Sequence, residues 1–101
     1  MRILFVVNQI RGEAWDASKP LRSQELWDEH AAYMDQLTDE GFILLGGPLG
    51  YADGEAMLVV EAPDEEMVYN TLARDPWRQS GHLIVPKIQR WIIFLEAARE
   101  D

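Results

Sequence analysis

The stretch HAAYMDQLTDEGFILLGGP, residues 30–48, passes from a helical pattern through a helix stop into an apolar strand. Apolar side chains recur at the spacing of one helix face: Leu26, Tyr33, Met34 and Leu37. Residues 23–40 are therefore predicted to be a helix, which ends where Gly41 can adopt a left-handed conformation. The apolar residues 42–45 then predict a strand, closed by two glycines and a proline.

The flanking sequence completes a regular order of elements. Residues 3–7 form a short apolar run typical of a strand, and residues 56–61 predict a strand that pairs with 42–45 across a turn at residues 51–55. Residues 63–74 begin with proline and acids, as helices often do, and residues 84–95 predict a last long strand.

The resulting order, β-α-β-β-α-β, predicts the α+β fold of a ferredoxin-like sandwich. In that fold a four-stranded antiparallel sheet carries two helices on one face. At 101 residues the chain can bury one core but not two, so residues 1–101 are expected to form one domain.

The strands are apolar on both sides, although two helices can cover only one face of the sheet. Ile3, Phe5 and Val7 alternate with apolar residues, and the same holds around Trp91 and Ile93. A second copy of the chain is the natural cover for the remaining face, so we expect a homodimer, with higher homo-oligomers left open.

Composition excludes several classes of function. With 18 acidic and 9 basic residues the chain has a formal charge of −9, which disfavours nucleic acid and anionic membrane surfaces as partners. There is no cysteine, so disulfides and thiolate catalysis are absent. The apolar runs are far shorter than the roughly 20 residues of a membrane-spanning helix. A soluble cytoplasmic protein is the expectation.

His30 occupies a place in the helical stripe where a soluble domain would normally have an apolar residue. An imidazole exchanges protons near neutral pH, and burying it requires partners for its ring nitrogens. That partner could be a core carbonyl, a carboxylate, a water-filled pocket or a ligand. His82 follows Gly81 in a polar loop and is expected to be solvated; two histidines so placed predict no metal site.

Residues 30–49 resemble the central block of the YCII-related family, which has a helical histidine, a glycine 11 residues later and an apolar strand ending in Gly-Pro-Leu. Asp75-Pro76-Trp77 and Gly81 are similar to the second half of the pattern, and the resemblance extends over residues 2–94. It implies a dimeric α+β barrel and a His–Asp dyad formed by His30 and Asp75. It also implies small ring compounds as substrates, converted by dehydrochlorination or related proton transfers.

Asp75 also has a simpler interpretation, because an aspartate before Pro76 commonly caps a short helix. Two departures from the family are visible. First, Trp27 stands where many relatives have an arginine, and the nearest upstream arginine, Arg22, lies one turn further away. Second, the last strand lacks the proline that an Arg-Pro-Trp segment would have before Trp91.

Five residues are candidates for contacts with a substrate. Gly47 and Pro48 could let a ligand approach bare backbone, although a simple turn explains them equally. Trp27 and Trp77 could wall a ring, although core packing explains them as well, and Arg22 is the remaining cation near His30.

The leading hypothesis is a cofactor-free, enzyme-like protein. His30 would act as general acid and base, oriented by Asp75, in the isomerisation of a small organic molecule or an elimination from it. The competing hypothesis is a non-catalytic dimer that binds a small metabolite through the same cavity. In a third, His30 is only a hydrogen-bonded core residue.

Overall fold

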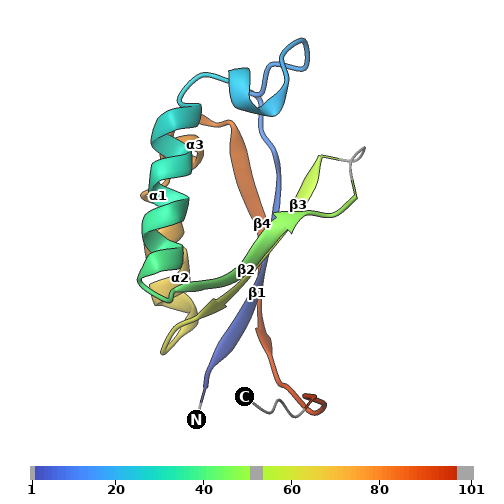
Figure 1. Ribbon diagram of the computed structural model, residues 1–101, viewed down its shortest axis with the longest axis vertical. Coiled ribbons are helices and arrows are strands. Elements are labelled where there is room, and N and C mark those ends of the chain that lie inside the picture. The colour runs from blue at the N-terminus through green and yellow to red at the C-terminus, as the bar shows by residue number, and fades with distance from the viewer. Residues whose placement is uncertain (1, 51–53, 98–101) are drawn as a thin grey trace.

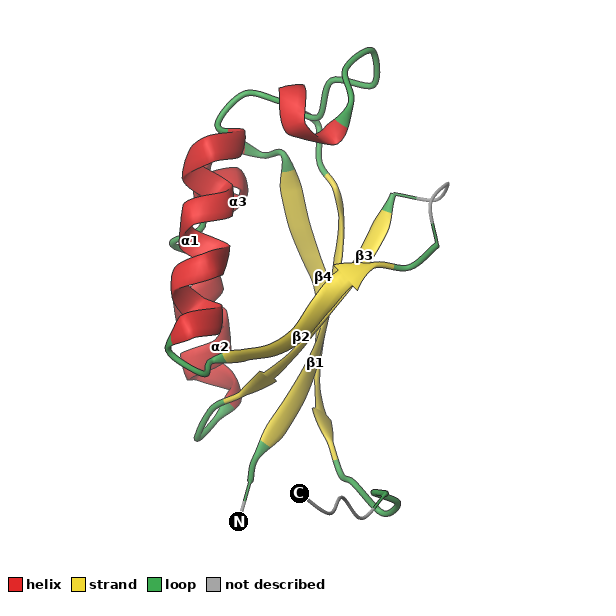
Figure 2. Cartoon of the chain, viewed as in Figure 1, coloured by secondary structure: helices red, strands yellow, loops and turns green. Residues whose placement is uncertain are grey.

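The computed structural model describes residues 2–50 and 54–97 (Figure 1). Its elements follow in the order β1 (Leu4–Arg11), the 3-10 turn η1 (Leu21–Ser23), α1 (Trp27–Asp39), β2 (Ile43–Pro48), β3 (Glu55–Glu61), α2 (Glu65–Leu72), α3 (Pro76–Ser80) and β4 (Leu83–Trp91). The four strands form one antiparallel sheet in the order β2-β3-β1-β4. The helices cover one face of this sheet (Figure 2), which confirms the predicted ferredoxin-like topology.

The core lies between the helices and the inner face of the two central strands. Phe5 and Val7 of β1 pair with Val60 and Leu58 of β3, and all four side chains are buried. They meet Leu37, Ile43, Val68 and Leu72 from the neighbouring elements. Full burial of such a side chain contributes about 1.5–3 kcal/mol, so this cluster supplies most of what holds the helices to the sheet.

Helix α1 begins at Trp27, later than predicted. Leu26 has a φ of 65° and is 39% exposed, so it belongs neither to the helix nor to its buried stripe. The cause lies in the preceding loop, where the buried Gln24 amide bonds to the backbone of Asp16 and Lys19. That anchor separates η1 from α1, and the chain turns through the left-handed Leu26 at a cost of about 1–2 kcal/mol.

The predicted end of the first helix agrees with the structure, whereas the second helix is shorter than predicted. Gly41 has a φ of 81° immediately after α1, as the sequence predicted for the helix stop. Helix α2 is shorter than the predicted 63–74 segment, because Asp64 is its cap and accepts a hydrogen bond from the Met67 amide at 2.8 Å.

The ends of three strands differ from prediction. Strand β1 continues to Arg11 instead of stopping at Val7. Strand β2 continues to Pro48 instead of stopping at Leu45, and β4 ends at Trp91 instead of Leu95. The limit of β4 is set by its partner, because Trp91 pairs with Leu4 at the beginning of β1. Beyond that position no β1 residue remains to complete the ladder. Residues 51–53 of the predicted turn lie outside the described residues.

None of the helices in the described chain is sufficiently long and apolar to span a membrane.

Tyr33 ties α1 to α2, and its removal tests that link. Its hydroxyl donates to the Thr71 carbonyl at 2.7 Å, and burial raises the pKa of the phenol above its usual value. We expect Tyr33→Phe to lower the free energy of unfolding by about 0.5–1.5 kcal/mol in a urea titration at neutral pH. Tyr69→Phe, at an exposed site on α2, is the matched control and should leave stability unchanged.

The same hydrogen bond has a pH dependence of defined sign. Because the pKa is raised in the folded protein, Tyr33 contributes its stabilisation fully below the unfolded value of about 10 and loses it as the pH rises through the folded value. Wild type should therefore lose stability above pH 10 faster than Tyr33→Phe. Equal stability of the two at neutral pH would contradict the assigned link.

Candidate active site

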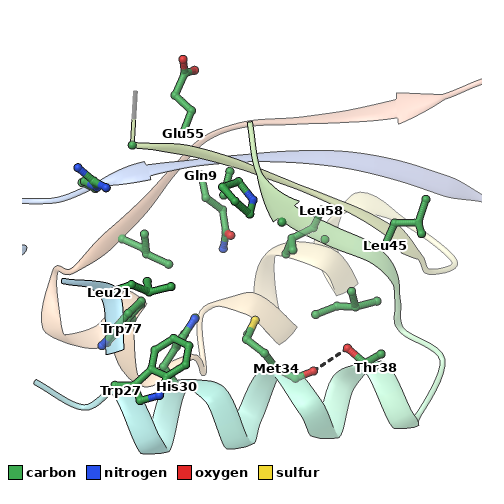
Figure 3. A pocket seen from close by; sticks show the side chains of 18 of the residues that line it. Gln9, Leu21, Trp27, His30, Met34, Thr38, Leu45, Glu55, Leu58 and Trp77 are labelled. Carbon is green, nitrogen blue, oxygen red and sulfur yellow. Dashed lines mark hydrogen bonds between the residues drawn. The ribbon is translucent and has the colours of Figure 1, made fainter. Parts of the chain in front are cut away.

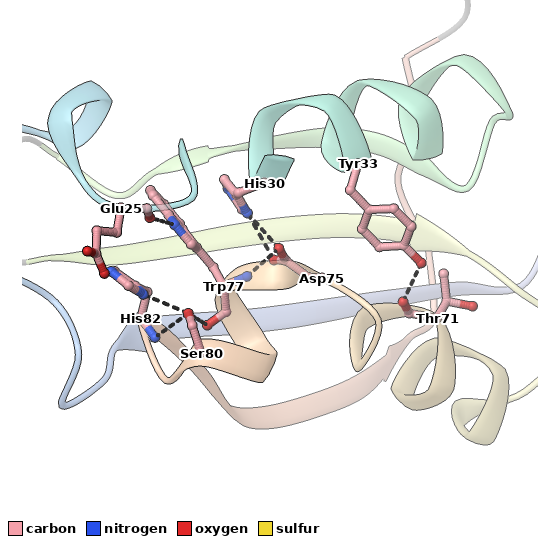
Figure 4. A network of polar contacts seen from close by, with 8 residues as sticks. All are labelled: Glu25, His30, Tyr33, Thr71, Asp75, Trp77, Ser80 and His82. Atoms are coloured by element: carbon pink, nitrogen blue, oxygen red, sulfur yellow. Dashed lines mark hydrogen bonds and ion pairs between the residues drawn. The ribbon is translucent and has the colours of Figure 1, made fainter. Parts of the chain in front are cut away.

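His30 and Asp75 meet between α1 and the connection that leads from α2 to α3. His30 Nδ1 lies 2.8 Å from Asp75 Oδ1 and 3.0 Å from Oδ2 (Figure 4). His30 is 8% exposed and Asp75 is fully buried. The first turn of α1 aims the imidazole inward, and the Asp75 amide bonds to the Leu72 carbonyl at the end of α2. The two residues are 45 positions apart, and only the fold brings them together.

Asp75 is at the same time the cap of α3. Its Oδ1 accepts a hydrogen bond from the Trp77 amide at 3.0 Å, and Pro76 occupies the first helical position. The two interpretations of Asp75 that the sequence left open are therefore both present, because one carboxylate has enough acceptor sites for an amide and an imidazole.

The contact determines which nitrogen of His30 is available. In the described part of the chain, His30 is the only ionisable side chain that pairs with Asp75. A carboxylate facing Nδ1 holds a proton on that nitrogen, so Nε2 carries the free lone pair of the neutral ring. Nε2 has no hydrogen-bond partner among the described residues. The arrangement can therefore take up a proton at Nε2, and the carboxylate then stabilises the imidazolium.

Aromatic side chains fix the plane of the imidazole. The His30 ring stacks on Trp77 with 4.0 Å between ring centroids and 11° between planes. Trp77 is held in turn by a hydrogen bond from its indole nitrogen to the Glu25 carbonyl at 2.7 Å. Trp15 and Trp27 pack against Trp77 with centroid distances of 5.4 and 5.6 Å. The stacked rings leave His30 little freedom to rotate away from Asp75.

A pocket of about 620 Å³ lies between α1 and the inner face of the sheet, and His30 is part of its wall (Figure 3). Much of the lining is apolar: Leu21, Met34, Ile43, Leu58 and Leu83. This volume falls within the range of small-molecule sites, which combine apolar walls with a few polar groups.

The structure brings four of the five predicted contact residues to this pocket. Gly47 and Pro48 line it from β2, and Trp27 and Trp77 line it from the helical side. Arg22 is not among the lining residues; it is exposed, with its guanidinium 5.8 Å from the centre of the Trp27 ring.

Sequence reasoning did not assign the other lining residues to a site, among them Gln9, Arg11 and Trp15. The alternation of β1 contained the signal for the first two, because residues 9 and 11 share the inward face of Phe5 and Val7. Trp15 could not be placed from its loop sequence; the Arg11 guanidinium lies 4.7 Å from the centre of its ring.

The prediction that His82 is solvated is wrong. His82 is 4% exposed, its Nδ1 lies 2.6 Å from Ser80 Oγ, and Figure 4 shows Trp77 between the two histidines. The loop after β1 covers it, because the Gly12 amide donates to the His82 carbonyl at 2.8 Å. Gly12 permits this approach: a Cβ there would lie 2.2 Å from the Gly81 carbonyl oxygen.

No cluster of three or more acidic or histidine side chains that could bind a metal occurs in residues 2–50 and 54–97.

Comparison with known proteins shows the family of the chain and a solved structure with a similar fold. The YCII-related domain model matches residues 1–92. The fold is similar to 5-chloro-2-hydroxyhydroquinone dehydrochlorinase from Burkholderia phenoliruptrix AC1100, solved in complex with 2,5-dihydroxybenzoquinone. The TM-score is 0.61 at 23% sequence identity, over 88% of this chain and 93% of that one. No curated protein matches the chain.

The double role of Asp75 can be measured against a residue that only caps. Asp75→Ala removes a cap and leaves His30 Nδ1 unpaired, so unfolding should become easier by about 2–4 kcal/mol. Asp64→Ala removes only the cap of α2 and should cost about 1 kcal/mol. Chemical denaturation of both variants gives the comparison. Equal losses would mean that the contact with His30 contributes nothing to stability.

Proposed function

This chain belongs to the YCII-related family, and on that premise we propose that it transfers protons on a small cyclic organic molecule. His30 is the general acid and base, and Asp75 is the carboxylate that orients it. The observation that carries the proposal is the position of His30: a buried carboxylate holds Nδ1 while the ring lines a pocket of about 620 Å³.

The chemistry follows from that arrangement. Nε2 removes a proton from the substrate, and the electron pair left behind forms a new π bond. In an isomerisation the imidazolium returns the proton to another atom of the substrate. In an elimination a leaving group such as chloride departs with its bonding pair, and the proton passes from His30 to water. Asp75 stabilises the imidazolium in both cases by its negative charge.

The size and lining of the pocket support a small ring as substrate. Trp77 already stacks between His30 and His82, so the half-buried Trp27 is the ring of this pair that a substrate can pack against. An offset or edge-on ring gains about 0.5–1.5 kcal/mol from such a neighbour. The structurally similar dehydrochlorinase is named for a chlorinated hydroxyhydroquinone and was solved with a dihydroxybenzoquinone. A substrate of this general size fits the proposal.

A non-catalytic module that binds a metabolite is the alternative. Its support is the replacement of the arginine found in many relatives by Trp27, together with the exclusion of Arg22 from the pocket lining. Without a cation one turn before His30, the pocket has fewer groups to stabilise developing negative charge. His30 would then serve only as a hydrogen-bonding partner for a bound molecule.

We also propose that two copies of the chain associate through the outer face of the sheet. This face, turned away from the helices, carries apolar residues on three strands: Val6, Ile10, Val59, Ile84 and Trp91. Ile84 is 47% exposed and Trp91 is 45% exposed in the single chain. Large apolar side chains gathered on one sheet face favour a partner, and a second copy presents the same surface.

The catalytic proposal is tested by chloride release from 5-chloro-2-hydroxyhydroquinone, followed by ion chromatography. We expect His30→Gln to lower the enzyme-dependent rate by about 10²- to 10⁴-fold. Asp75→Asn should lower the rate as well, because the carboxylate that orients His30 is lost. Glutamine keeps a donor and an acceptor, so the variant should remain folded by circular dichroism. Glu29→Gln, beside His30 in sequence but exposed, is the control and should retain the wild-type rate.

The outcomes separate the two functions. If wild type releases chloride no faster than buffer alone, and if wild type and His30→Gln bind the compound equally well, the binding module is supported. Wild-type turnover that persists in His30→Gln would contradict His30 as the acid–base group.

Light scattering tests the association of two copies. We expect wild type to have twice the chain mass of 11.6 kDa at micromolar concentration. Ile84→Lys should shift it toward the monomer, because a charge would be buried at the interface. Met67→Lys, an equally exposed apolar residue on α2, should remain dimeric. A monomeric wild type would remove the proposed interface.

A further inference from the structure

Gln9 is a buried polar residue whose hydrogen bonding is incomplete. It lies on the inner face of β1, is 4% exposed and is part of the pocket lining. Figure 3 shows its amide pointing from the sheet toward α1, into the space beside Met34. In residues 2–50 and 54–97, no partner is found for its buried Nε2. Buried side-chain donors in native proteins are nearly always paired, so this group needs an explanation.

Gln24 shows how the same side chain behaves when its role is structural. It is 3% exposed, and its amide is fully used: Oε1 accepts from the Asp16 amide, and Nε2 donates to the carbonyls of Asp16 and Lys19. Of these two buried glutamines, Gln24 holds a loop in place through three hydrogen bonds, whereas the Nε2 of Gln9 has no partner among the described residues. The second faces the pocket.

We propose that Gln9 binds the substrate, by donating a hydrogen bond from Nε2 to an oxygen of a molecule held against His30. The inference rests on the proposed function in placing the substrate in this pocket. Gln9 projects from the sheet and His30 from α1, so the two polar groups face the pocket from opposite walls (Figure 3). A ring between them is fixed at one oxygen while its reacting atom faces Nε2 of His30.

The residues that line the pocket with Gln9 indicate whether the substrate oxygen that it binds is charged or neutral. An amide is an uncharged partner, and the surrounding lining includes Met34, Leu58 and Leu83. Placing an ionised group against apolar side chains without a counter-ion is strongly unfavourable. Arg11, the next inward position of β1, also lines the pocket, but it is exposed at the end of the strand, where its guanidinium lies 4.7 Å from the centre of the Trp15 ring. The substrate is therefore a small ring with an uncharged hydroxyl or carbonyl oxygen at the Gln9 end.

Binding of phenol and toluene, two rings that differ in one oxygen, tests this role. Each is titrated into 15N-labelled protein, and dissociation constants are taken from amide chemical shifts. We expect the ratio of the toluene to the phenol constant to fall about 3- to 10-fold in Gln9→Met relative to wild type. Gln36→Met, the same change at an exposed position of α1, should keep the wild-type ratio.

A stability comparison tests whether Gln9 has a structural role instead. Gln9→Met removes an unpaired polar group and should keep or raise the Tm, whereas Gln24→Met breaks three hydrogen bonds and should lower it. An unchanged ratio, a wild-type protein that does not bind phenol, or a Gln9→Met variant as destabilised as Gln24→Met would each overturn the inference.

This test and the test of the proposed function fail separately. Phenol carries no leaving group, so its binding reports on Gln9 regardless of any turnover by His30. Absence of chloride release together with a Gln9-dependent preference for phenol would reject the catalytic proposal and retain this one. Chloride release without a Gln9-dependent preference for phenol would retain the catalytic proposal and reject the role of Gln9.

Discussion

The buried contact between His30 and Asp75 is the constraint on which the site depends. Asp75 has no exposed surface, and a carboxylate removed from water is tolerated only when its oxygens are hydrogen-bonded. The imidazole and the Trp77 amide both bond to it. The same group thus starts α3, joins that helix to α1 and sets the tautomer of His30. Trp77, carried by α3, then stacks on the imidazole and restricts its rotation.

The pocket lies where the inward-facing side chains of β1 change from apolar to polar. Phe5 and Val7 fill the core at one end, whereas Gln9 and Arg11 occupy the same face further along and turn toward the pocket. Gly46 of β2 leaves room for the side chain of its partner Leu58 on β3: a Cβ there would lie 2.6 Å from a methyl carbon of Leu58. The result is a cavity with apolar walls and few polar groups, each on a rigid element.

Differences between expectation and structure arise where a distant residue decides a local conformation. Leu26 continues the helical spacing, yet the buried amide of Gln24 holds the preceding loop and delays the helix to Trp27. The apolar run after Trp91 looks like a strand, yet β1 begins at Leu4 and offers no further partner. His82 follows a glycine in a polar segment, yet the loop after β1 folds over it.

The sequence by itself determined the order of the elements, the topology of the sheet and the inward position of His30, because these follow from hydrophobic spacing and helix stops that act over a few residues. It also contained both interpretations of Asp75 without the means to choose between them. Only the tertiary structure decided that one carboxylate does both, that Arg22 lies outside the pocket and that Gln9 lies inside it. Contacts between residues far apart in the chain depend on packing geometry, which no local pattern encodes.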